Sequence, residues 1–265
     1  MLTKLQRSYT TALGLGLVVL SGCATLPGPG NPSDPWESYN RTMYKVNDRL
    51  DRAVLKPVAQ GYRKVVPELL RVGVNNFFSN LGDVAVAVND VFQGKFLQAA
   101  SDGGRILVNS TIGLFGVIDV GTQIGLRKHN EDFGQTLGYW GVTPGPYLIV
   151  PLLGPSTVRD SLGGLVDAPL TYWPYINVMR VRNITYMVDS VKARANVLDT
   201  EKVLDEAAAL DPYAFTRDSF LQRRNSLVYD GNLPRKPEEE MEEDNEFQLP
   251  SKEPTSLEKP HTQDR

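Results

Sequence analysis

Cysteine and histidine are scarce in this chain of 265 residues, which contains one cysteine, Cys23, and two histidines. A single cysteine excludes an intramolecular disulfide, so packing has to stabilise the fold. Outside residues 235–265 the only histidine is His129, which excludes a metal centre built from several histidines and leaves at most one imidazole base. We therefore expect no metal, no cofactor and no enzymatic activity.

An excess of basic charge is also missing. Residues 24–234 contain 21 Lys or Arg against 21 Asp or Glu, whereas residues 235–265 contain 5 against 10. A neutral body with an acidic tail lacks the basic stripe that a phosphate backbone requires. Nucleic acid is therefore not an expected partner.

The one cysteine stands at the end of Leu20-Ser21-Gly22-Cys23, after a short apolar run that cationic residues precede. The run from Thr11 to Leu20 is too short to cross a hydrocarbon core of about 30 Å as a helix, so the pattern indicates a bacterial lipoprotein signal. We expect acylation of the Cys23 thiol, and each buried CH₂ of an acyl chain contributes about 0.8 kcal/mol to anchoring. Ala24, where inner-membrane lipoproteins commonly carry Asp, favours the periplasmic face of the outer membrane. The alternative is an ordinary secretory signal followed by a chance cysteine.

Composition divides the chain into four parts. Residues 24–33 include three prolines and two glycines, which block both helix and sheet. After residue 232 acidic residues dominate and apolar residues are few, so this segment cannot pack. We expect a signal peptide at 1–22, a flexible tether at 23–33, one folded domain at 34–232 and a disordered acidic tail at 233–265.

Apolar residues three and four apart predict a mostly helical domain, because strict alternation over a strand's length is nearly absent. Residues 36–54 supply one apolar helix face, with Asp34 as the capping residue before Pro35. Pro67 opens a second helix, in which Leu70 is expected to point inward. Further helices are expected at 83–93, at 95–112, at about 181–208, and from Asp211-Pro212 to a point before Gly231.

Two apolar stretches are interrupted by glycine and proline. Residues 106–126 are too broken for a spanning helix and predict two short helices that meet at a glycine-rich bend. Residues 138–154 predict an apolar loop or hairpin, which is unusual because loops ordinarily lie in water. The aromatic residues expected at the depth of lipid headgroups are Trp140, Tyr172, Trp173 and Tyr175.

Charged residues follow the second apolar stretch. Arg159, Asp160 and Asp167 lie in or just after a short apolar helix, and charges beside a lipid-facing segment are costly unless they pair or face water. Either they form ordinary surface ion pairs, or they line a water-filled channel that receives polar headgroups. The candidates for such a lipid path are Gly141, Gly145, Tyr147, Arg159, Asp160 and Asp167.

Ser156 and His129 are the residues that would support a hydrolase. His129 lies among charged neighbours and is interpreted as an exposed loop residue, and Ser156 is expected to cap the helix at 158–166. No strained nucleophile motif stands near either one. A phospholipase-like activity is kept as the alternative function.

Six blocks of sequence resemble the MlaA/VacJ family of outer-membrane lipoproteins. They occur in the family's order, which makes the combination specific although each block alone is weak. One departure is Val84 after Asp83, where many relatives carry proline. The blocks are 33–44 (SDPWESYNRTMY), 74–81 (VNNFFSNL), 92–95 (FQGK), Arg105 with 109–113 (NSTIG), 132–138 (DFGQTLG) and 145–160 (GPYLIVPLLGPSTVRD).

The resemblance implies an all-α, ring-like protein that lies in the inner leaflet of the outer membrane. It implies removal of stray glycerophospholipid from the outer leaflet through a central amphipathic channel, and transfer to a periplasmic lipid-carrier protein. It also implies that a trimeric porin holds the lipoprotein. The third hypothesis is a passive lipoprotein that only braces a porin.

Overall fold

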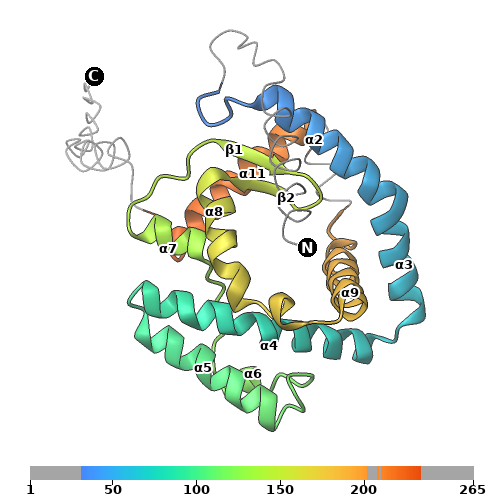
Figure 1. Cartoon of the computed structure of the whole chain (residues 1–265), viewed down its shortest axis with the longest axis vertical. Coiled ribbons are helices and arrows are strands. Elements are labelled where there is room, and N and C mark those ends of the chain that lie inside the picture. The colour runs from blue at the N-terminus through green and yellow to red at the C-terminus, as the bar shows by residue number, and fades with distance from the viewer. Residues whose placement is uncertain (1–30, 202–207, 209, 234–265) are drawn as a thin grey trace, which may run out of the picture.

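The computed structural model describes residues 31–201, 208 and 210–233. The expected signal peptide, Cys23, most of the tether and nearly all of the acidic tail lie outside these residues. Within them the chain forms a ring of helices that a two-stranded hairpin helps to close (Figure 1). The expectation of a mostly helical, ring-like domain with one hairpin is confirmed.

The elements follow one another with short connections. Helices α2 and α3 are continuous, because a π-helical turn, η1, joins them without a break in helical geometry. In chain order the described elements are α2 (Glu37–Leu50), η1 (Asp51–Leu55), α3 (Lys56–Val65), α4 (Glu68–Phe92), α5 (Phe96–Thr111), α6 (Val120–Gln123), α7 (Phe133–Tyr139), β1 (Tyr147–Val150), β2 (Gly154–Thr157), α8 (Val158–Asp167), η2 (Ala168–Leu170), η3 (Trp173–Tyr175), α9 (Met179–Val197) and α11 (Pro212–Val228).

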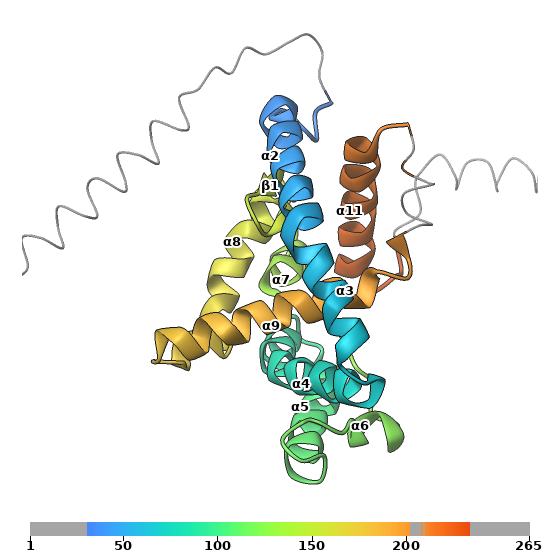
Figure 2. The same ribbon diagram turned by 90° about the vertical axis from the view of Figure 1, so that its right-hand side faces the viewer.

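The α2–α3 rod forms one side of the ring, with α9 packed against α3 (Figure 1). Helix α4 runs across the base, and α8 with the hairpin forms the opposite side. Figure 2 shows the ring from the side, with α5 and α6 projecting beyond α4 and α11 standing apart from them. Helices α5 and α6 therefore form an arm that is fastened to the ring mainly through α4.

The hairpin pairs β1 with β2 in antiparallel register, from Tyr147 opposite Thr157 to Val150 opposite Gly154. The hairpin was predicted within residues 138–154. In the structure its first strand begins only at Tyr147, and its second strand continues to Thr157. Asn40 of α2 holds it in place, since its Nδ2 donates to the Tyr147 carbonyl at 3.0 Å and its Oδ1 accepts from the Ile149 N–H at 2.8 Å. The side-chain amide of Asn40 therefore pairs with the backbone of β1 as a third strand would.

Replacing Asn40 with alanine is expected to destabilise the protein by about 3 kcal/mol, because each buried polar group that loses its partner costs about 1–3 kcal/mol. Thermal unfolding of the purified protein in detergent measures the loss. Asn47→Ala is the matched control, since Asn47 makes the same two kinds of bond to Val150 and Leu152 but is only half-buried. Equal losses in the two variants would contradict this account.

The distribution of polar and apolar side chains is unusual. Among the described residues sixteen polar or charged side chains are buried, against nine hydrophobic ones. The apolar face predicted at 36–54 is largely exposed, and Leu70, expected to point inward, is 59% exposed. The helix period was predicted correctly, but the assumption that the apolar face meets the core was wrong, because periodicity does not say which medium that face contacts.

Several helix ends differ from expectation. Asp34 does not cap α2, whose N-cap is Trp36 without a side-chain bond; Asp34 is buried and accepts hydrogen bonds from Asn40 and Tyr213. The segments expected at 67–81 and 83–93 form one helix, α4. Asp211 caps α11 as predicted. Helix α9 ends at Val197, and residues 202–207 of the longer helix expected there lie outside the described part.

Candidate lipid-binding site

The α5–α6 connection builds one wall of a groove. Its backbone is left-handed at three successive residues, Leu114, Phe115 and Gly116, which turns the chain back over α4. Only glycine fits at position 116, since a Cβ there would lie 2.7 Å from the Cβ of Asn80. The glycine-rich bend predicted within 106–126 is therefore present, and it brings Val117 against Gly73 of α4.

This groove has a volume of about 1040 Å³ and lies between the first half of α4, the bend, Tyr62 of α3 and Val188 of α9. Polar groups are few and include Asn76, Asp119 and Gln123. Such a surface is unfavourable in water, because burial of apolar area contributes about 25 cal/mol per Å². Its apolar lining consists of Val66, Leu69, Leu70, Val72, Val74, Phe77, Phe78, Val117, Ile118 and Val188.

Arg105 and Asp119 fix the far wall of the groove. The side chain of Arg105 is 2% exposed, and its Nη2 lies 3.0 Å from the Asp119 carboxylate, which also caps α6. Burial opposes ionisation of Asp119, but hydrogen bonds from Thr122 and Arg105 and the Arg105 charge lower its pKa to about 2. The bend is therefore held by a charge that persists to low pH.

Asp119→Asn is expected to destabilise the protein at neutral pH, because the buried Arg105 loses its nearest carboxylate. The folded pKa of Asp119, about 2, lies below its ordinary value of 3.8. The difference in unfolding free energy between wild type and variant is therefore constant above about pH 4 and shrinks as the pH falls towards 2. Urea unfolding in detergent at pH 2.5 and pH 6 measures it; equal differences at both pH values would refute this role.

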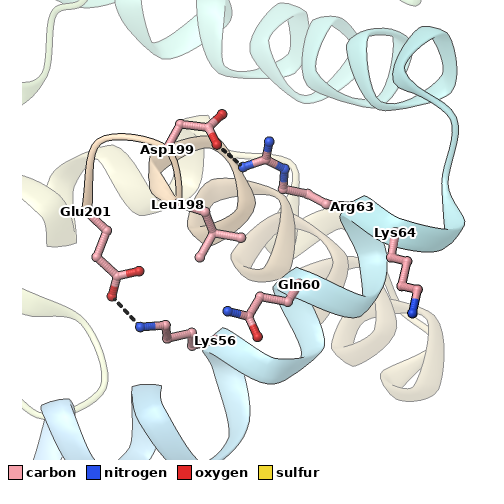
Figure 3. A pocket seen from close by; sticks show the side chains of 7 residues that line it. All are labelled: Lys56, Gln60, Arg63, Lys64, Leu198, Asp199 and Glu201. Atoms are coloured by element: carbon pink, nitrogen blue, oxygen red, sulfur yellow. Dashed lines mark hydrogen bonds and ion pairs between the residues drawn. The ribbon is translucent and has the colours of Figure 1, made fainter.

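A second hollow, of about 510 Å³, lies between α3 and the segment that follows α9. Figure 3 shows Lys56 paired with Glu201 and Arg63 paired with Asp199, with Leu198 between the two pairs. The distances are 2.9 Å from Lys56 Nζ to Glu201 Oε1 and 2.7 Å from Arg63 Nη1 to Asp199 Oδ1. Sequence reasoning did not single out this charged hollow, because its cations and anions are about 140 residues apart in the chain.

Tyr62 of α3 and Arg71 of α4 each carry a buried donor atom. The Tyr62 hydroxyl, whose residue lines the groove, and the Arg71 Nε have no hydrogen-bond partner among the described residues. Burial raises the pKa of Tyr62, and the nearby Arg71 charge partly opposes this shift. The hydroxyl therefore stays protonated and is able to donate.

The residues predicted for a lipid path lie in different places. Gly141 and Gly145 are exposed and have positive φ, as expected for a glycine-rich loop. Tyr147 is 0% exposed and packs with Ile149 and Tyr213 in the hydrophobic core. The expectation that Tyr147 lines a lipid path is wrong, because its strand turns this side chain inward against α11.

Arg159 and Asp160 belong to a buried ion-pair cluster. Arg224 of α11 bridges Asp132 and Asp160 at 2.6 Å and 2.9 Å, and Arg159 pairs with Asp160 at 3.1 Å. Burial raises the pKa of Asp132, but the hydrogen bonds and charge of Arg224 outweigh it and hold that pKa below its ordinary value. Arg159 and Asp160 follow the ion-pair alternative, although their side chains are only 6% and 9% exposed. Sequence reasoning missed Arg224.

Asp167 has a different environment, at the C-terminus of α8. Its carboxylate accepts hydrogen bonds from Asn89 Nδ2 and from the Phe133 N–H, both at 2.8 Å. Burial raises the pKa of Asp167 despite these bonds. It therefore links α4, α7 and α8.

The two hydrolase candidates do not form a catalytic pair. Ser156 lies in β2 and its hydroxyl bonds to Ser161 and to the Thr157 carbonyl. Thr157, one residue later than expected, caps α8. His129 is partly buried, not exposed as expected, and its Nδ1 lies 2.7 Å from Asp102. Hydrolysis by Ser156 with His129 as base has no support among the described contacts.

Two of the expected interface aromatics are strongly exposed. Trp140 is 69% and Tyr175 72% exposed, and each directs its polar atom to a backbone carbonyl, of Phe92 and Pro169 respectively. Tyr172 is half-buried against Phe78, with ring centroids 5.8 Å apart. Trp173 lies in η3, but its side chain is outside the description.

The helices of residues 31–201 and 210–233 include none that combines the length and hydropathy needed to cross a membrane. A helical ring with a polar interior, an apolar exterior and an apolar groove nonetheless defines a class of protein whose surface is suited to lipid.

The model of the MlaA lipoprotein family matches residues 32–227, and the chain belongs to this family. An Escherichia coli (strain K12) relative, named intermembrane phospholipid transport system lipoprotein MlaA, is 35% identical over 238 residues, which cover 86% of this chain and 91% of the relative. A Haemophilus influenzae relative of the same name is 33% identical over 235 residues, which cover 86% and 92%. A solved structure from work on the structural basis for maintenance of bacterial outer membrane lipid asymmetry matches with a TM-score of 0.66 at 33% identity, covering 74% of this chain and 99% of that one.

Proposed function

We propose that this chain is the outer-membrane lipoprotein of a phospholipid transport system and removes phospholipid that has strayed into the outer leaflet. The names of its Escherichia coli and Haemophilus influenzae relatives, and the lipid asymmetry addressed by the related structure, support this function. The observation that carries it is the apolar groove of about 1040 Å³, together with a charged hollow that shares helix α3 with it. A phospholipid needs both environments, because its chains are apolar and its headgroup is charged.

Acyl chains on Cys23 hold the ring at the periplasmic face of the outer membrane, in its inner leaflet. The exposed apolar side chains of α2, α3 and α9 meet lipid chains there, while the ring keeps its charges paired and away from hydrocarbon. Trp140 and Tyr175 suit the depth of the headgroups, since each is exposed and has its polar atom bonded.

In the groove the acyl chains contact Leu70, Val72 and Phe77. The phosphodiester lies towards the cations of α3, Lys56 and Arg63. Gly141, Gly145 and Asp167 stay in the proposed lipid path, since the two glycines are exposed and Asp167 is only partly buried. Tyr147 is excluded from it by its burial.

No bond is made or broken in this function. The sequence has no nucleotide-binding loop, so directionality comes from other components of the system. A trimeric porin holds the lipoprotein in the membrane, and a periplasmic carrier protein receives the lipid.

The test is surface-exposed phospholipid in a strain that lacks this protein. Deletion is expected to raise it and full-length protein to restore the normal level. Labelled phospholipid mixed with purified protein should yield no free fatty acid. Release of fatty acid that disappears in Ser156→Ala or His129→Ala would establish a phospholipase instead, and unchanged surface phospholipid after deletion would leave only a porin-bracing role.

A further inference from the structure

Three potential metal ligands meet at the junction of α4, α5 and the segment before α7. They are Asp90, Asp102 and His129, and one ligand atom of each lies within 4.8 Å of the others. Asp90 and Asp102 are both 0% exposed, and the side chain of His129 is 23% exposed. The cluster is therefore interior, with the imidazole at its edge.

Within the described part of the chain, Asp90 is the residue of this cluster whose buried carboxylate lacks a partner. Among the described residues neither of its carboxylate oxygens has a hydrogen-bond partner, although both are fully buried. Lys95, whose charge favours ionisation of Asp90, is already paired with Glu131 at 3.1 Å and with Asp230 at 2.7 Å. A buried carboxylate in this position is costly unless a proton or a cation compensates it.

We propose that Asp90, Asp102 and His129 bind one Zn²⁺ ion. Two carboxylates and a neutral imidazole carry a charge of minus two, which a divalent ion neutralises. Tetrahedral zinc with bonds of about 2.0–2.2 Å places its ligand atoms roughly 3.4 Å apart, so ligand atoms that now lie within 4.8 Å of one another have to adjust as the ion binds. The contact of 2.7 Å between His129 Nδ1 and Asp102 Oδ2 is a hydrogen bond, which bound Zn²⁺ would replace with its own bonds to these two atoms.

The site joins the arm to the ring. Asp90 lies near the end of α4, Asp102 lies in α5, and His129 lies in the connection from α6 to α7. Helix α5 and the bend after it carry Val117 and Ile118, which form a wall of the groove. Bound Zn²⁺ therefore fastens the wall of the groove to α4. This proposal does not depend on lipid transport, and it revises the expectation from sequence that the chain binds no metal, which had considered only sites of several histidines.

The experiment is Zn²⁺ titration by calorimetry of the mature, full-length protein in detergent, after treatment with EDTA. We expect one equivalent per chain and an increase in Tm, with affinity reduced by roughly 100-fold or more in Asp90→Asn and His129→Gln. His261→Gln is the matched control, because His261 is the only other histidine of the chain, and it should bind as wild type does. If Asp90→Asn does not fold, His129→Gln decides the matter, since its ring is at the edge of the cluster.

Three outcomes would overturn the proposal. The first is no binding of Zn²⁺ to wild-type protein, which would leave Asp90 and Asp102 sharing a proton. The second is equal binding in wild type and His129→Gln. The third is loss of binding in His261→Gln alone, which would place the ion on the tail.

Discussion

Replacing Cys23 with alanine is expected to raise surface-exposed phospholipid to the level of a strain that lacks the protein. The thiol is the proposed acylation site, and each buried CH₂ contributes about 0.8 kcal/mol to anchoring. None of the described helices combines the length and hydropathy of a membrane span. Without acyl chains the protein leaves the outer-membrane fraction or stays attached through an uncleaved signal.

Membrane fractionation, surface phospholipid and detergent sensitivity measure this effect together. Ala24→Ser is the matched control, since it changes the next residue but keeps the thiol, and it should behave as wild type. Quantitative outer-membrane recovery with normal activity in Cys23→Ala would show that the lipoprotein interpretation is wrong.

Most of the helices, though not all of their ends, could be predicted from the sequence, because helix signals are local. Asp211 before Pro212 marks the start of α11, and the apolar period of 36–54 marks the α2–α3 rod. Asp34 shows the limit of such signals, since its position before Pro35 resembles a cap. Its actual partners, Asn40, Tyr213 and Arg217, are six to 183 residues away, and tertiary packing overrides the local pattern.

The candidate site was less predictable, for two physical reasons. Helix periodicity identifies an apolar face but gives the same pattern for a face that meets a core and one that meets lipid. Polar contacts also join distant segments: Arg224 reaches Asp132 across 92 residues, and Arg63 reaches Asp199 across 136. Asp90 and Asp102 carried no sequence signal of a shared site, because only the packing of α4 against α5 brings them together.

The groove makes the sharpest prediction about lipid binding. Val72→Asp is expected to weaken lipid binding at least roughly tenfold, because it places a charge among apolar side chains that the acyl chains should contact. Val72 is 46% exposed, so the substitution leaves the core intact. Photo-crosslinking of purified protein to a phospholipid with a reactive group in its acyl chain measures the loss, and surface phospholipid reports its consequence in cells.

Val91→Asp is the matched control, because Val91 lies on the same helix, is 49% exposed and is not among the residues that line the groove. Both substitutions add one charge to an exposed apolar position of α4, so any general effect on membrane insertion should be shared. Only the loss of lipid in the groove should distinguish Val72→Asp. If both variants crosslink equally well, or if both fail to the same extent, the lipid path does not run through this groove, and the exposed face around Gly141 and Gly145 becomes the place to search for it.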